Sequence, residues 1–179
     1  EHLRSGAETF PDTALHFVGG PHPSSIRLGE MHQRALGLAG GLAELGVGPG
    51  DVIAIWVPNW LEGALTYQAA LMLGATVVPI IHFYGPDEVR FIVRQSGARV
   101  LVTPPAFGGV DHLANLAAVR ADLGGLDTVV VAGTADEARS SRVSARPSVP
   151  GSIRSMTMAS GMPRAIARRI FTPSPASRT

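Results

Sequence analysis

The sequence contains no cysteine, which excludes a disulfide bond, a thiolate nucleophile and a zinc–thiolate site. It contains no lysine either, because all 15 basic residues are arginine. This absence excludes Schiff-base chemistry and leaves no lysine to hold a phosphate group. A chain without disulfides fits the reducing cytoplasm, where we expect this protein to reside.

Long uninterrupted apolar runs are also missing. The longest apolar stretch, residues 63–81, is broken by Gln68, Gly74 and Pro79, so we expect no membrane span. No basic segment followed by an apolar one marks a secretory signal. The apolar fraction of 45% and the length of 179 residues are typical of one globular domain.

Acidic residues are absent after Glu137. Residues 1–137 hold seven arginines and all 14 acidic residues, a net charge of −7, whereas residues 138–179 hold eight arginines, a net charge of +8. The second segment is also rich in serine and proline and shows no strand alternation. We therefore predict a folded body over residues 1–137 and a disordered Arg/Ser/Pro-rich tail over residues 138–179.

The hydrophobic pattern of the folded body predicts an α/β fold. Two short runs, 15–18 and 24–27, flank a Gly-Gly-Pro-His-Pro segment and predict a hairpin. The segments expected after it are strands at 52–57, 75–80, 99–102 and 128–132, and helices at 28–45, 60–73, 86–97 and 111–123. This alternation of strands and helices predicts a parallel sheet with helices on both faces. Residues 128–132 are the last segment with a clear strand pattern.

Several single residues allow two interpretations. Asn59 follows a strand at the edge where open α/β sheets bind ligands, and we favour a helix N-cap over a ligand contact. His82, Phe83 and Tyr84 follow the next strand, and we favour a surface loop over a cleft.

No histidines and carboxylates show metal-ligand spacing, and the other histidines singled out are scattered along the chain: His16, His22, His32 and His112. The glycines of the 46–50 turn precede a strand instead of following one, which is the wrong context for a dinucleotide loop. Trp56 and Trp60 are most simply explained by packing between helix and sheet.

Four segments in a row carry a further pattern. Residues 26–52 join a helix to a GVGPGDV turn, and residues 55–60 (IWVPNW) end a strand in Pro-Asn. Residues 71–80 (LMLGATVVPI) and 88–102 follow in order. At this spacing the segments resemble the N-terminal part of the AMP-forming acyl-CoA synthetases, within the adenylate-forming superfamily. The stretch at 104–112 is most similar to bacterial ligases for medium-chain or cyclohexanecarboxylate-type acids.

The resemblance implies that residues 1–137 form an incomplete N-terminal subdomain of such an enzyme. In the full-length family, a small carboxylic acid attacks ATP, with Mg²⁺, to give an acyl-adenylate, and coenzyme A then displaces AMP. The phosphate loop, the magnesium-binding acid and a C-terminal lysine lie downstream of the matched segment. The family-motif positions present here are expected to be structural: Gly50, Asp51, Pro58, Asn59, Gly74 and Pro79.

The nearest counterpart of the phosphate loop is residues 157–165. It keeps Ser160, Gly161 and a proline before Arg164, but it lacks the threonines, the second glycine and the lysine, and it is several residues short. These three residues are the only candidates for nucleotide binding, and we favour a chance resemblance. For this chain alone we expect no catalytic residue, no metal, no cofactor and no activity.

A second hypothesis is a small non-enzymatic α/β binding module whose basic tail binds an acidic partner. The tail has no aromatic residue except Phe171 and no nucleic-acid-binding motif, so we expect no specific nucleic acid. If the chain is a ligase fragment, a sheet without its later strands exposes an unpaired edge, and we expect self-association.

Overall fold

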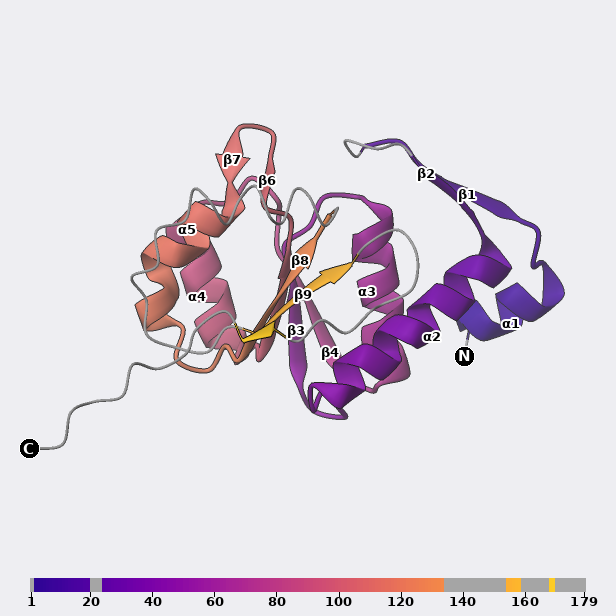
Figure 1. The fold of residues 1–179 in the computed structure, drawn as a ribbon, viewed down its shortest axis with the longest axis horizontal. Coiled ribbons are helices and arrows are strands. Elements are labelled where there is room, and N and C mark those ends of the chain that lie inside the picture. Colours follow the sequence, from indigo (N-terminus) through magenta and orange to yellow (C-terminus); the bar gives the residue numbers. More distant parts are fainter. Residues whose placement is uncertain (1, 20–23, 134–153, 159–167, 170–179) are drawn as a thin grey trace, which may run out of the picture.

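The computed structural model describes residues 2–19, 24–133, 154–158 and 168–169 (Figure 1). Its helices are α1 His2–Thr9, α2 Leu28–Glu44, α3 Leu61–Met72, α4 Pro86–Ser96 and α5 His112–Val119, followed by a 3-10 turn at Arg120–Asp122. Its strands are β1 Ala14–Phe17, β2 Ser24–Arg27, β3 Val52–Ile55, β4 Thr76–Pro79, β5 Val100–Thr103, β6 Ala106–Phe107, β7 Val110–Asp111, β8 Thr128–Ala132, β9 Arg154–Met158 and β10 Arg168–Arg169.

A six-stranded sheet in the order β10-β9-β8-β5-β3-β4 forms the centre of the fold. Its strands β4, β3, β5, β8 and β9 are mutually parallel, and β10 pairs with β9 in the antiparallel sense. The predicted α/β fold with a parallel sheet is confirmed. The strand order reverses between β3 and β5, and we call the carboxyl end of that boundary the switch point, the place where open α/β sheets bind ligands.

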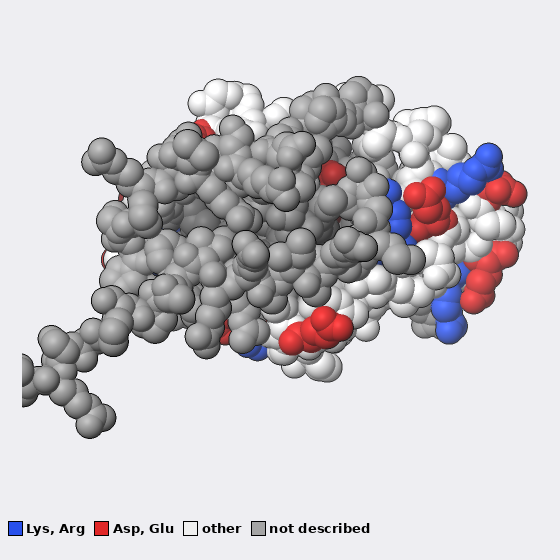
Figure 2. Space-filling view, in the orientation of Figure 1, with Lys and Arg blue, Asp and Glu red and all other residues white. Residues whose placement is uncertain are grey.

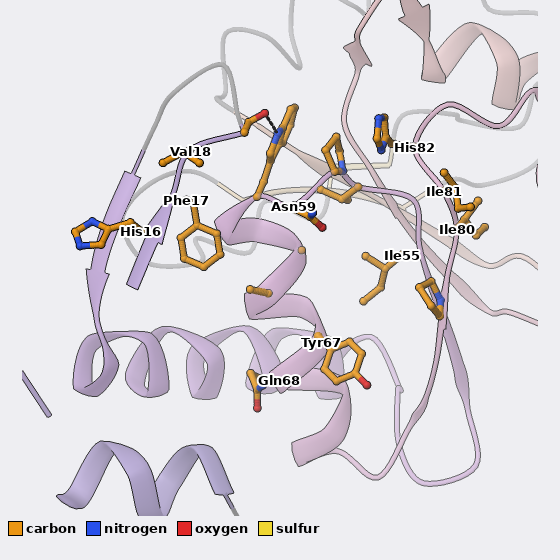
Figure 3. A pocket seen from close by; sticks show the side chains of 17 residues that line it. His16, Phe17, Val18, Ile55, Asn59, Tyr67, Gln68, Ile80, Ile81 and His82 are labelled. Carbon is orange, nitrogen blue, oxygen red and sulfur yellow. Dashed lines mark hydrogen bonds between the residues drawn. The ribbon is translucent and has the colours of Figure 1, made fainter. Parts of the chain in front are cut away.

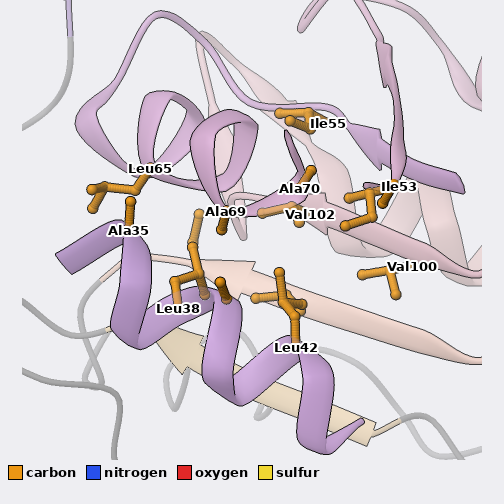
Figure 4. Close-up of a cluster of buried hydrophobic side chains, with 14 of the residues drawn as sticks. Ala35, Leu38, Leu42, Ile53, Ile55, Leu65, Ala69, Ala70, Val100 and Val102 are labelled. Carbon is orange, nitrogen blue, oxygen red and sulfur yellow. The ribbon is translucent and has the colours of Figure 1, made fainter. Parts of the chain in front are cut away.

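The sheet is buried on both faces at β3, β5 and β8, which explains why these strands are nearly continuous apolar runs. Successive residues of β3 point to opposite faces: Ile53 and Ile55 join one core, and Ala54 and Trp56 join the other. The first core packs against α2 and α3 (Figure 4) through Ala35, Leu38, Leu42, Leu65, Ala69 and Ala70. The second packs against α4 and α5 through Val89, Val93, Leu116 and Val119. Figure 1 shows the two helix pairs on opposite sides of the sheet.

Most helix boundaries follow from local signals. Pro86 stands in the first turn of α4, and Gly97 ends that helix at a φ of 65°, a conformation that glycine adopts without a Cβ clash. Asp111 caps α5, because its Oδ1 accepts the Ala114 N–H at 2.8 Å. The N-cap predicted at Asn59 is wrong: α3 has Trp60 as its N-cap residue, with no side-chain cap hydrogen bond.

Five elements were not predicted: helix α1 and strands β6, β7, β9 and β10. Helix α1 precedes the opening hairpin, and the short β6–β7 hairpin lies between β5 and α5. Strand β9 lies beyond residues 128–132, so that run is not the last strand of the sheet. Arg154–Met158 contains few β-favouring residues, and it forms a strand because β8 offers it a full ladder, from Thr128 paired with Arg154 to Ala132 paired with Met158.

Strand β4 lies at one edge of the sheet. The N–H groups of Thr76 and Ile80 donate to the Asp51 and Ile55 carbonyls of β3, so the backbone groups of Val77 and Pro79 face outward. Proline has no N–H, and Pro79 therefore removes a donor from the open edge. Such a position is typical of edge strands that resist pairing with another chain.

Charges of both signs are interspersed on the end of the molecule formed by α1 and the β1–β2 hairpin (Figure 2). The ion pairs there join Arg27 to Asp12 at 2.9 Å and, at longer range, Arg4 to Glu8 and Arg34 to Glu30. These exposed pairs contribute little to stability. None of the helices within the described ranges has the length and apolar character needed to cross a membrane.

The amino ends of three strands are tied together by Arg99. Its Nη1 donates to Asp51 Oδ1 at 2.8 Å before β3, and its Nε donates to Asp127 Oδ2 at 3.0 Å before β8. Asp51 Oδ2 also accepts the Gly48 N–H at 2.9 Å. The hydrogen bond from Arg99 is the main reason that the pKa of Asp51 lies below its usual value of 3.8.

We expect Asp51→Asn to lower the free energy of unfolding by about 1–2 kcal/mol at pH 7, since it removes a charge-assisted hydrogen bond. A carboxyl group with a lowered native pKa stabilises the fold above its unfolded pKa and loses that effect as the pH falls through the native value. The difference between variant and wild type should therefore shrink below about pH 4. Urea titrations from pH 7 to pH 3 measure it, with the exposed Glu44→Gln as control; an equal loss in the control would contradict the assignment.

Candidate functional site at the carboxyl edge of the sheet

An open cleft of about 930 Å³ lies at the carboxyl ends of β3 and β4 (Figure 3). The β1–β2 hairpin forms one wall and α3 the other. The residues that line it are His16, Phe17, Val18, Gly19, Ile55, Val57, Pro58, Asn59, Trp60, Gly63, Ala64, Tyr67, Gln68, Pro79, Ile80, Ile81 and His82. Most of these side chains are apolar, and the polar ones are amides, imidazoles and one phenol.

Trp60 joins the loops around this cleft. It is buried, and its Nε1 donates to the Gly19 carbonyl at 3.2 Å, which fastens the hairpin to the start of α3. Its ring also meets Phe107 of the β6–β7 hairpin edge-on, with centroids 5.2 Å apart. Phe107 in turn contacts the ring of His82 at 5.5 Å. These three rings bring together loops that follow β1, β4 and β5.

A second set of contacts lies beneath the loop between β4 and α4. Trp56, fully buried at the end of β3, donates its Nε1–H to the Ile81 carbonyl at 3.1 Å. Its ring lies 4.3 Å from the imidazole of His112, which is also fully buried. His112 Nε2 lies 3.0 Å from the His82 carbonyl, and Nδ1 lies 3.1 Å from the Val110 carbonyl.

Burial lowers the pKa of His112 below its usual value of 6.5, because the charged ring loses its hydration. The two backbone carbonyls and Asp111 act in the opposite direction but do not outweigh burial. His112 is therefore a neutral ring at pH 7.

The structure separates the six family-motif residues into two groups. Pro58, Asn59 and Pro79 line the cleft. The other three lie at the opposite edge, where Gly50 N–H donates to the Gly74 carbonyl at 3.4 Å and Asp51 binds Arg99. Asn59 is exposed in the cleft instead of capping α3.

The candidate nucleotide-binding residues Ser160, Gly161 and Arg164 lie outside the described residues. Strand β9 is parallel to β8 and ends at Met158, two residues before Ser160 in the sequence, so its last residue lies at the carboxyl edge of the sheet. That is the edge at which the cleft opens.

The donor set of the cleft does not fit a magnesium triphosphate. Its lining, as far as the structure describes the chain, includes no arginine, aspartate or glutamate, and the chain has no lysine. Among the described residues no three histidine or acidic side chains form a cluster that could hold a metal ion. The lining instead offers apolar contact area with a few hydrogen-bonding side chains, which suits an uncharged or weakly polar group.

Two features of the site were not predicted. His112 was grouped with scattered histidines, but it is fully buried. One signal was present: His112 directly follows the capping Asp111, so it belongs to the first turn of a helix in contact with the sheet. His82 was expected in a surface loop; it is half-buried and lines the cleft, whereas Phe83 is 64% exposed.

The chain matches the family model described as AMP-binding enzyme over residues 3–172. Among curated proteins it is 38% identical over 79 residues to the 4-coumarate–CoA ligase of Pinus taeda, covering 44% of this chain and 14% of that protein. It is 30% identical over 102 residues to the oxalate–CoA ligase of Arabidopsis thaliana, covering 56% of this chain and 20% of the relative. The chain thus spans about a fifth or less of the curated relatives it matches.

Solved structures show the same fold. The N-terminal domain of FACL13 from Mycobacterium tuberculosis superposes with a TM-score of 0.65 at 26% identity, covering 84% of this chain and 37% of that chain. A fatty acyl CoA synthetase of the same organism gives a TM-score of 0.64 at 26% identity, covering 90% of this chain and 32% of the other.

Proposed function

Because the chain belongs to the AMP-binding enzyme family, we propose that it is the N-terminal part of an ATP-dependent carboxylic acid–CoA ligase. The match over residues 3–172 carries this proposal, and the α/β fold with helices on both faces supports it. The full-length enzyme would activate a small carboxylic acid and would require ATP, Mg²⁺ and coenzyme A. Its expected location is the cytoplasm.

The acid that such an enzyme would activate is a separate question. The relatives are named for 4-coumarate, oxalate and acetate, and this spread favours no single acid. The medium-chain or cyclohexanecarboxylate assignment therefore remains a prediction from residues 104–112. A panel of such acids, tested with a chain that includes the downstream phosphate loop, distinguishes the candidates by acid-dependent pyrophosphate exchange. No exchange with any acid would contradict the ligase proposal.

We further propose that residues 1–179 are inactive alone and that the six motif residues are structural. The contacts of Asp51 with Gly48 and Arg99 support a structural role at the amino edge. The alternative is a small non-enzymatic α/β binding module with a basic interaction tail, which the eight arginines after Glu137, with no acidic residue among them, favour. The coding sequence downstream, in any frame, separates the two: a Ser-Gly-Thr-Thr-Gly-x-Pro-Lys-Gly-like run supports the ligase.

The division at residue 137 predicts a protease pattern. Acidic residues and apolar periodicity both stop there, so we expect trypsin to cut at Arg139, Arg142 and Arg146 well before Arg90 and Arg94 of α4. Mass spectrometry of a time course identifies the fragments. If the two groups of sites are cut at the same rate, the division is wrong.

Self-association is the expected behaviour of the isolated chain. Pro79 limits strand pairing at β4, so we expect apolar side chains to drive it, notably Tyr67, Leu71 and Ile81, each 45–54% exposed. Size-exclusion chromatography should show species larger than the 18.7 kDa monomer, and Leu71→Glu should shift them toward it. A stable wild-type monomer would support the binding module.

A further inference from the structure

The loop between β4 and α4 crosses the switch point. Its Ile81 carbonyl is held by Trp56 at the end of β3, and its next carbonyl, that of His82, faces His112 at the start of α5. Because α5 follows β5, the two buried rings hold the loop across the boundary between β3 and β5. The same loop supplies Ile81 and His82 to the rim of the cleft.

When its ring is neutral, His112 has fewer hydrogen-bond donors than the acceptors around it. Both ring nitrogens face backbone carbonyl oxygens, at 3.0 Å and 3.1 Å, and a carbonyl oxygen can only accept. A neutral imidazole has one N–H donor, so it can bind one of the two carbonyls and leaves the other facing a lone pair. An imidazolium has two N–H donors and satisfies both.

We propose that His112 is a positioning residue that acts as a latch: protonation adds a second hydrogen bond and fastens the β4–α4 loop to the β6–β7 hairpin across the switch point. The neutral ring alternates between the His82 and Val110 carbonyls and holds the loop less tightly. The latch therefore makes the position of the β4–α4 loop, which forms part of the cleft rim, depend on pH.

The groups around the ring determine how readily His112 is protonated. Asp111 favours the charged ring, whereas burial and a charged His82 side chain oppose it. Other charged or titratable groups lie on the packed elements: Tyr84 in the loop and Asp87, Glu88, Arg90 and Arg94 on α4. Within the part of the chain that the structure describes, none of them forms a hydrogen bond with the ring.

The latch predicts a pH dependence of loop protection that a buried histidine with a purely structural role would not show. The native ring binds a proton less readily than the unfolded one, so lowering the pH below about 6.5 should lower the free energy of unfolding of the whole chain. Only at lower pH, as the native ring itself is protonated, should the loop become better protected, because the protonated ring holds both carbonyls. The His112 contribution to global stability thus falls while the native ring is still neutral, and the loop protection rises at lower pH, as that ring is protonated.

Hydrogen exchange followed by mass spectrometry tests this on the full 179-residue chain, with no activity required. Exchange of the His112 C2 hydrogen between pH 8 and the acid unfolding midpoint reports protonation of the ring. Exchange of the backbone amides in peptides covering residues 81–85, corrected for intrinsic rates, reports the loop. We expect loop exchange to slow about fivefold as the ring is protonated, the factor that one ordinary hydrogen bond contributes.

Two variants separate the latch from general pH effects. His112→Phe keeps a ring against Trp56 but has no donor, so its corrected loop exchange should not depend on pH. His2→Gln removes an exposed histidine of α1 that does not line the cleft, and it should behave as wild type. If His112→Phe fails to fold, the wild type alone still tests the latch. Its loop exchange should change over the same pH range in which the C2 exchange reports protonation of His112. The proposal is wrong if loop exchange does not change as the His112 ring is protonated, or if the ring stays neutral until the chain unfolds.

Discussion

Residues 1–179 should give ATP–pyrophosphate exchange no higher than background with medium-chain, aromatic and alicyclic acids. ATP carries about four negative charges, which family enzymes neutralise with converging N–H groups, a basic side chain and Mg²⁺. Here the lysine count is zero, and no acidic residue follows Glu137. The described cleft offers no arginine and no carboxylate in compensation.

The one segment that could contradict this expectation follows β9. In the sequence, Ser160 and Gly161 come shortly after β9, a parallel strand that ends at the carboxyl edge, and a phosphate loop follows a strand in this way. Arg164 would then stand in for the missing lysine, with a planar guanidinium in place of a compact ammonium. Acid-dependent exchange above background in the wild type, lost in Arg164→Ala but kept in Arg178→Ala, would show that this segment binds the nucleotide. Isothermal titration with ATP–Mg²⁺ gives a second readout.

The central fold could be predicted because its strands and helices carry redundant local signals. Val52–Ile55 and Val100–Thr103 are apolar on both faces, so the parallel sheet follows from sequence alone. Pro86, Gly97 and Asp111 mark helix ends through their own backbone or side-chain chemistry. Strand β9 could not be predicted, because Arg154–Met158 becomes a strand through pairing with β8 and not through its own composition.

The site could be predicted only in outline, since its contacts join loops far apart in the chain. Asn59 shows the difficulty: a polar residue between a strand and a helix is usually a cap, but α3 starts at Leu61 and the amide faces the cleft. His112 and His82 are 30 residues apart, and no local pattern indicates that one ring meets the other's carbonyl. Buried polar pairs of this kind depend on tertiary packing, which spacing alone does not reveal.

Trp56 should be the most costly single side chain to remove among the residues that hold the carboxyl edge. It is fully buried, packs in the second core against α4 and α5, and binds Ile81 and His112. We expect Trp56→Ala to lower the free energy of unfolding by about 3–5 kcal/mol, because it leaves a large cavity. That is a substantial share of the roughly 5–15 kcal/mol typical of a domain.

Urea denaturation followed by circular dichroism measures this loss of stability in two Trp56 variants and one control. Trp56→Phe keeps a ring beside His112 and loses the hydrogen bond to Ile81, whose carbonyl still accepts the Tyr84 N–H at 3.0 Å. It should therefore cost about 1–2 kcal/mol, and it remains measurable if Trp56→Ala does not fold. Phe91→Ala is the control, because Phe91 is 63% exposed on α4 and its removal should change stability by no more than about 0.5 kcal/mol. If Trp56→Ala cost no more than Phe91→Ala, the loops at the carboxyl edge would not depend on the buried ring, and the switch point would be held by the sheet alone.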